Sequence, residues 1–186
     1  MSHLVLFLSN RPLPQEAFRN SLEGLGEELD FHNEREGEFL LSKRKLPLLL
    51  KKLEEDPSAF GGNTAFLIAP KFDGFSAKLL HEALEFFPNR LKYLSDIILN
   101  EMSFGDYSSL PFVNAIFRDL PEEWILSARK YLECGQDALL AADALYIHRN
   151  TFSYRLEQFQ KRSQIDIRDY HDALLFEIYL QFIEKD

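Results

Sequence analysis

The stretch QDALLAADALYIHRNTFSYRLEQFQKRSQ, residues 136–164, decides how the C-terminal part of the chain folds. In its first half Leu139, Ala142 and Leu145 recur at three-residue steps. This spacing places the three side chains on one face of a helix. The face is small and apolar, which lets a partner helix approach closely.

A second helix is predicted after a tight turn at residues 146–147. Phe152, Leu156 and Phe159 follow at steps of four and three residues, so this helix also has one apolar face to bury. The two apolar faces can close on each other. The sequence therefore predicts a helix-turn-helix.

Polar side chains begin the second helix on the side away from its apolar face, at Arg149, Asn150, Ser153 and Tyr154. A helix whose N-terminal end enters a major groove reads base edges with its first residues, and Arg and Asn match guanine and adenine. His148 falls at the expected N-cap. Its neutral imidazole would cap the helix, or its cationic form would contact a phosphate.

The remaining candidates along this helix have two interpretations each. We expect Thr151 to pack its methyl group at the helix start, with a phosphate contact as the alternative. Tyr154 would stack against sugar and phosphate or cover the turn, and Arg155 would pair with Asp166 or contact a phosphate. Lys161, Arg162 and Arg168 are general phosphate candidates. The predicted DNA-binding residues are His148, Arg149, Asn150, Thr151, Ser153, Tyr154, Arg155, Gln158, Lys161 and Arg162.

The string AADALYIHRNTFSYRLEQF, residues 141–159, resembles the signature of the PucR/CdaR family of bacterial transcription regulators. The family's C-terminal helix-turn-helix carries a His-Arg-Asn-Thr run followed by Tyr-Arg-Leu, found here at residues 148–151 and 154–156. The flanks agree, with an upstream helix at 121–133 and a downstream helix at 169–182. The resemblance implies that residues 121–186 form a domain that binds double-stranded DNA.

Composition limits the remaining classes of protein. The 186 residues are 46% hydrophobic and include 17 Phe, enough for a substantial core in one large or two small domains. No apolar run approaches a membrane span, and the N-terminus lacks the features of a signal peptide. The single Cys134 excludes an intramolecular disulfide and a Cys-based zinc site. We expect a cytoplasmic protein.

Charge argues against unaided DNA binding. The formal net charge is −9, and from Pro121 onward 8 basic residues face 12 acidic ones. Residues 146–168 differ, because five basic residues against two acidic ones leave a local balance of +3. Few phosphate contacts give weak binding that falls as salt rises, which favours a homodimer or higher oligomer. The alternative is a protein-interaction module that keeps the fold without binding DNA.

Residues 1–90 alternate predicted strands and helices. Strands are expected at 3–8, 29–31, 38–42 and 64–69, and helices at 14–29, 46–53 and 73–87. Ala17, Phe18, Leu22 and Leu25 would form the stripe of the first helix. The order predicts an α+β fold, a ferredoxin-like βαββαβ domain with helices over one face of the sheet, followed by the all-α helix-turn-helix domain.

This topology also resembles a degenerate GGDEF-like domain. Residues 35–39, Arg-Glu-Gly-Glu-Phe, stand where a diguanylate cyclase has Gly-Gly-Asp-Glu-Phe, and only Glu38 and Phe39 match. The first strand supplies no carboxylate for a metal ion, and Glu36 replaces a needed glycine. We expect no cyclase activity, no catalytic residue and no cofactor. The five His residues lack ligand spacing, so we expect no metal site.

Residues 91–120 are predicted to be a helical connector, with a helix from Leu91 to Met102, a break at 104–109 and a helix at 110–120. The connector would pack the domains together or supply the dimer interface. The same alternatives apply to the last helix, although the domain core is favoured for Leu174, Leu175, Ile178, Tyr179 and Phe182. The sequence does not indicate the effector.

Overall fold

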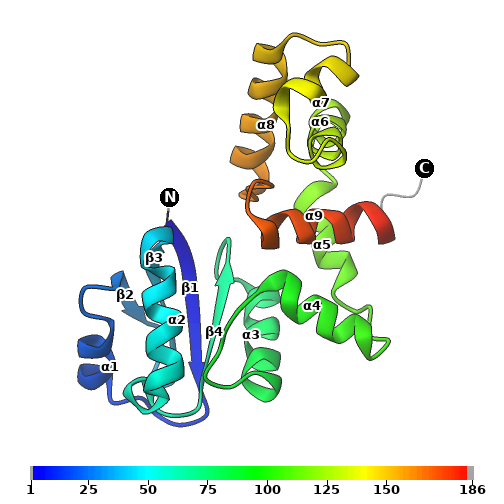
Figure 1. The fold of residues 1–186 in the computed structure, drawn as a ribbon. Coiled ribbons are helices and arrows are strands. Elements are labelled where there is room, and N and C mark those ends of the chain that lie inside the picture. Colours follow the sequence, from blue (N-terminus) through cyan, green and yellow to red (C-terminus); the bar gives the residue numbers. More distant parts are fainter. Residues whose placement is uncertain (1, 184–186) are drawn as a thin grey trace. The chain divides into compact units, whose positions relative to one another are not determined.

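The computed structural model describes residues 2–183. The chain divides into two compact units, residues 1–100 and residues 101–186 (Figure 1). The division falls within helix α4 (Leu94–Ser103). The predicted connector at residues 91–120 is therefore divided: residues 91–100 belong to the first unit and residues 101–120 to the second. No helix in the described part of the chain is both long and apolar enough to cross a membrane.

The N-terminal unit contains a five-stranded sheet. Its elements are β1 (Ser2–Ser9), α1 (Gln15–Leu22), β2 (Gly26–Phe31), β3 (Glu36–Ser42), α2 (Leu46–Glu55), β4 (Thr64–Ala69), α3 (Gly74–Phe86) and β5 (Leu91–Tyr93). Short 3₁₀ turns at Lys43–Lys45 and Pro57–Phe60 flank α2. The strand order is β2-β3-β1-β4-β5. Strand β1 pairs antiparallel with both β3 and β4, which is the order expected of a split βαβ domain. The predicted α+β class is confirmed.

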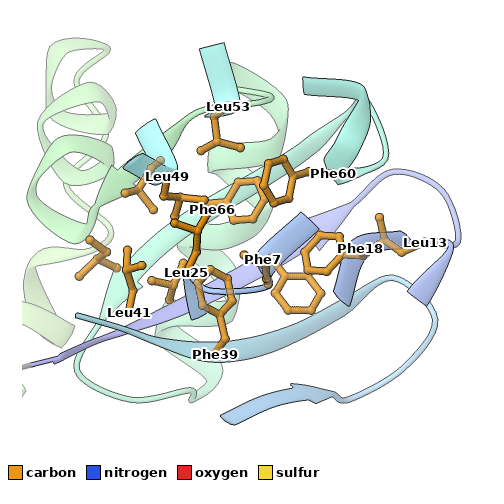
Figure 2. Packing of buried hydrophobic residues seen from close by; sticks show 14 residues of the cluster. Phe7, Leu13, Phe18, Leu25, Phe39, Leu41, Leu49, Leu53, Phe60 and Phe66 are labelled. Carbon is orange, nitrogen blue, oxygen red and sulfur yellow. The ribbon is translucent and has the colours of Figure 1, made fainter. Parts of the chain in front are cut away.

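One face of this sheet packs against α1, the 3₁₀ turn at Pro57–Phe60 and α2 (Figure 2). The ring of Phe7 on β1 lies 4.6 Å from that of Phe18 on α1. Phe18 also meets Phe60 edge-on at 5.7 Å and stacks on Phe66 of β4 at 6.3 Å. Because these four rings are almost completely buried, they fix α1 and the 3₁₀ turn on the sheet. Helix α2 joins the same cluster through Leu49 and Leu53.

The opposite face of the sheet is covered as well, so the prediction of helices on one face was wrong. Every residue of β4 is buried, as are the consecutive β1 residues 5–9. Helix α3 packs on β4 and β1 and buries Leu79, Leu80 and Ala83. Continuous apolar strands are typical of sheets covered on both faces, so the sequence of β1 and β4 already contained this information.

Two predicted element boundaries were also wrong. The helix expected at 14–29 ends at Leu22, because the chain turns at Gly24, with φ +73°, and enters β2 at Gly26. Leu25 is buried outside the helix, and Ala17 is exposed. Residues 91–93 form β5, which pairs parallel with β4, so α4 starts three residues later than expected. In both places hydrogen bonding within the sheet outweighs the helical periodicity.

The C-terminal unit is helical. Its elements after α4 are α5 (Leu110–Phe117), α6 (Glu122–Glu133), α7 (Ala138–Ala144), α8 (Arg149–Ser163) and α9 (Tyr170–Phe182). Phe117 of α5 contacts Phe159, Phe176 and Tyr179, with ring centroids at 5.9, 5.2 and 4.8 Å. Leu175 and Ile178 are buried too, as favoured from the sequence, whereas Phe182 is 47% exposed.

Candidate nucleic-acid interface

Helices α7 and α8 form the predicted hairpin, and both pack on α6 (Figure 1). Phe152 and Phe159 of α8 are fully buried, and Tyr131 of α6 lies 6.4 Å from Phe152 between ring centroids. The apolar face expected for α8 is therefore confirmed. Its contact with α6 holds α8 in place and leaves the opposite side of the helix available to solvent.

The buried face of α7 differs from the predicted one. Ala141 and Ala142 are buried, whereas Leu139 is 62% exposed. The carboxylate of Asp137 accepts hydrogen bonds from the backbone N–H groups of Leu139 and Leu140 at 2.9 and 3.0 Å, which fixes the start of this seven-residue helix. The Ala141–Ala142 pair thus faces inward, and Leu139 faces outward.

His148 caps the N-terminus of α8, as predicted. Its backbone is extended, with φ −68° and ψ 142°, and its Nδ1 accepts a hydrogen bond from the backbone N–H of Asn150 at 3.2 Å. The cap satisfies one of the free N–H groups at the start of the helix.

The polar residues of the first two turns of α8 are exposed. Tyr154 is 57% exposed, and Arg149, Asn150, Thr151 and Ser153 are exposed as well. Thr151 therefore does not pack its methyl group as expected. Within residues 2–183 none of these five side chains forms a hydrogen bond or an ion pair. The helix presents a row of unpartnered polar groups at its N-terminal end.

The helical repeat sorts these side chains into three rows at 100° per residue. The row opposite the buried face contains Asn150, Tyr154 and Lys161, together with Glu157. One flank carries Thr151, Gln158, Arg162 and Arg155, and the other carries Arg149 and Ser153. Arg155 and Gln158 are partly buried, whereas Lys161 and Arg162 are exposed. The structure thus spreads the predicted residues of α8 over the side opposite the buried face and over both flanks, with Arg149 and Arg155 on opposite flanks.

Arg168 is held within the domain. Its Nε lies 2.7 Å from Oδ1 of Asp166, and its guanidinium also donates to the side-chain oxygen of Gln160. The hydrogen bond that Arg168 donates to Asp166 raises the pKa of Arg168 against the lowering effect of burial. Asp166 is therefore paired with Arg168, and Arg155 forms no ion pair within the described residues. The alternative in which Arg155 ties the hairpin to Asp166 is wrong.

A groove of about 420 Å³ lies beside the C-terminal half of α8, and the sequence did not predict it. Gln158, Lys161 and Arg162 line one side. Asp119, Pro121 and Trp124 complete the lining. Because a carboxylate shares the groove with two cations, the charge there is mixed. Within residues 2–183 no group of three or more His, Cys, Asp or Glu could hold a metal ion.

One family model matches the same segment. The model of the PucR C-terminal helix-turn-helix domain matches residues 125–182. The uncharacterized protein YxkF of Bacillus subtilis (strain 168) is 42% identical over 45 residues, which are 24% of this chain and 15% of that protein.

A solved regulator of polyketide synthase expression from Bifidobacterium adolescentis is also similar in fold. It shares 14% identity at a TM-score of 0.48, over 96% of this chain and 78% of that one. The domain match coincides with the hairpin and its flanking helices α6 and α9. Residues 125–182 of this chain therefore belong to the PucR C-terminal helix-turn-helix domain family.

Proposed function

We propose that the chain is a transcription regulator that binds double-stranded DNA sequence-specifically, with α8 in the major groove. The observation that supports this most strongly is the row of exposed, unpartnered polar side chains at the start of α8. A second helix of a helix-turn-helix contacts base edges with its N-terminal residues, and these residues occupy that end. Folding alone does not require Arg149 and Asn150 together there.

The side chains divide into base and backbone contacts. Arg149 offers two parallel N–H donors to guanine O6 and N7, and Asn150 pairs with adenine N6 and N7. Ser153 and Tyr154 lie one turn further along and contact the next bases or the sugar edge. His148, Thr151, Arg155, Gln158, Lys161 and Arg162 contact phosphates and fix the position of the helix without selecting sequence.

The charge distribution favours more than one copy on the operator. A chain with a net charge of −9 is repelled by DNA except where positive charge is concentrated, as between Tyr146 and Arg168. Each copy therefore forms few phosphate contacts. A homodimer doubles them, and its two α8 helices would meet half-sites about one helical turn apart, roughly 34 Å. The N-terminal unit would mediate dimerisation or sense an effector, and a DNA partner implies a cytoplasmic location.

The proposal is tested by selection from random-sequence duplex DNA at two salt concentrations, with the mass of the protein measured by light scattering. The expected result is enrichment of an inverted repeat by a dimer. Arg149→Ala and Asn150→Ala should lose discrimination at one position each, by about 1–3 kcal/mol per base pair. The control is Arg19→Ala, which removes the same charge from exposed α1 in the N-terminal unit and should leave selection unchanged.

A second candidate is a protein-interaction module. The observation that favours it is the exposure of Leu139 and Leu140 on α7, 62% and 54%, in a strongly acidic chain. A well-folded protein that enriched no DNA sequence even at the lower salt would favour this module. The family indicates a regulator rather than an enzyme. We expect no cyclic dinucleotide from GTP, and detection of that product would contradict the absence of cyclase activity.

A further inference from the structure

Tyr146 combines two features that the packing of the helix-turn-helix does not explain. It is 97% exposed, the highest exposure among the large hydrophobic side chains of the described residues. Its backbone is left-handed, with φ +54°, in the turn that joins α7 to α8. A bulky residue at positive φ is strained, and a buried contact usually compensates for such strain. Here no buried contact does so.

The turn has a defined geometry in which glycine is the usual residue. The N–H of Tyr146 donates to the carbonyl of Asp143 at 3.0 Å, and the N–H of Ile147 donates to that of Ala142 at 3.1 Å. These two bonds form a Schellman motif that ends α7, with Tyr146 at its left-handed C′ position. Glycine adopts that conformation without strain. The fold therefore gains nothing from the phenol ring at this position.

The position of Tyr146 indicates what the ring contacts. It directly follows α7, the first helix of the motif, which in a bound helix-turn-helix crosses the DNA backbone. It also precedes His148 by two residues, at most about 7 Å of chain. If α8 enters the major groove with Arg149 and Asn150, the turn lies beside the sugar–phosphate strand at the edge of that groove.

We propose that Tyr146 is a DNA-backbone contact, with its ring against a deoxyribose and its O–H donating to a phosphate oxygen. This inference rests on the proposed function and adds to it a residue outside the reading helix. The contact is uncharged, so it displaces no counterion. It touches no base edge, so it strengthens binding to operator and to random DNA alike.

The test compares two glycine substitutions at left-handed positions. Gln164 at the end of α8 has φ +62°, is exposed, and donates its N–H to the carbonyl of Gln160 at 2.8 Å. Tyr146→Gly and Gln164→Gly both relieve left-handed strain, so neither should lower the melting temperature. Only Tyr146→Gly should weaken binding, by about 3- to 10-fold, and equally on a selected operator and on random duplex. The slope of log affinity against log salt should not change.

Two further variants separate the parts of the contact. Tyr146→Phe keeps the ring and loses the O–H, so it should lose part of the affinity. In Tyr146→Asn the new residue also adopts the left-handed conformation readily. This variant should bind DNA as weakly as Tyr146→Gly, so it tests the contact even if Tyr146→Gly proves less stable than the wild type.

Three results would overturn the proposal. The first is equal affinity of Tyr146→Gly and the wild type for DNA. The second is a loss of affinity by Tyr146→Gly that is confined to the operator. The third is a slope of log affinity against log salt that falls in Tyr146→Gly by the amount expected for one phosphate contact. A wild-type protein that bound no DNA would remove the proposed function and this contact together. Binding that was insensitive to Tyr146 would remove the contact alone.

Discussion

The Nδ1 atom of His148 accepts a hydrogen bond from the backbone N–H of Asn150 at 3.2 Å. His148 thus fixes the first turn of α8, and Asn150 projects its side-chain amide from that turn. Because the cap sets where the helix begins, it also sets the direction in which Asn150 points. This hydrogen bond therefore affects both the stability of the domain and its proposed recognition of DNA.

His148→Ala should lower the free energy of unfolding of the C-terminal unit by about 1 kcal/mol, because Ala provides no acceptor for the Asn150 N–H. It should also weaken operator binding. His148→Asn should restore most of the stability, since Asn is a strong N-cap. Trp124 of α6 is the only tryptophan of the chain, so its fluorescence in a urea titration reports this unit. Glu157→Ala, at an exposed position in α8 of the same unit, is the control. If His148→Asn were as unstable as His148→Ala, the capping role would be wrong.

The sequence predicted the hairpin well because its signals are local. The spacing of Phe152 and Phe159 and the polar start of α8 need no information from the rest of the chain. The prediction failed where tertiary contacts decide. Helix α7 has only seven residues, so three-residue steps did not determine which of its faces would pack on α6 and α8. The groove at Trp124 depends on the packing of α6 beside α8, which spacing along one helix does not show.

Phe117→Ala should unfold or severely destabilise the C-terminal unit. The ring is fully buried and contacts Phe159, Phe176 and Tyr179, so its removal leaves a cavity among three aromatic neighbours. The expected loss is about 3–5 kcal/mol, a large fraction of the stability of a small domain. The measurement is again urea denaturation followed by Trp124 fluorescence.

Phe112→Ala is the matched control on the same helix, because Phe112 is 45% exposed. Its cost should be within about 1 kcal/mol. Equal losses from the two substitutions would show that Phe117 is not the centre of this core.

Gly37→Ala should destabilise the N-terminal unit by more than about 2 kcal/mol. An added Cβ would lie 2.1 Å from the backbone oxygen of Asp30 and 2.6 Å from Cζ of Phe7. Both atoms belong to the sheet and its core and have little room to move. The glycine of this hairpin is therefore explained by strand packing, without any nucleotide.

Gly74→Ala is the control for this glycine. Gly74 is the first residue of α3, and its added Cβ would meet nothing within 4 Å. Ala favours helix, so the substitution should be neutral or stabilising by up to about 1 kcal/mol. Thermal unfolding followed by far-ultraviolet circular dichroism compares the two variants. A Gly37→Ala protein that melted like Gly74→Ala would contradict the steric explanation.

The cap of α3 should make part of the stability of the N-terminal unit depend on pH. Burial raises the pKa of Asp73, but hydrogen bonds from Ser76 and the ion pair with Lys71 outweigh it and hold the pKa below the ordinary 3.8. A carboxyl group with a lowered folded-state pKa stabilises the fold above pH 3.8, and this contribution disappears as the pH falls through the folded-state value. Asp73→Ala should cost about 1 kcal/mol at pH 7. Asp73→Asn keeps a cap but does not titrate, so its melting temperature should fall less than that of the wild type between pH 5 and pH 2.5. The control is Glu54→Gln, on the exposed side of α2, whose melting temperature should follow that of the wild type over the same range. Parallel wild-type and Asp73→Asn curves over this range would show that Asp73 does not link the fold to pH.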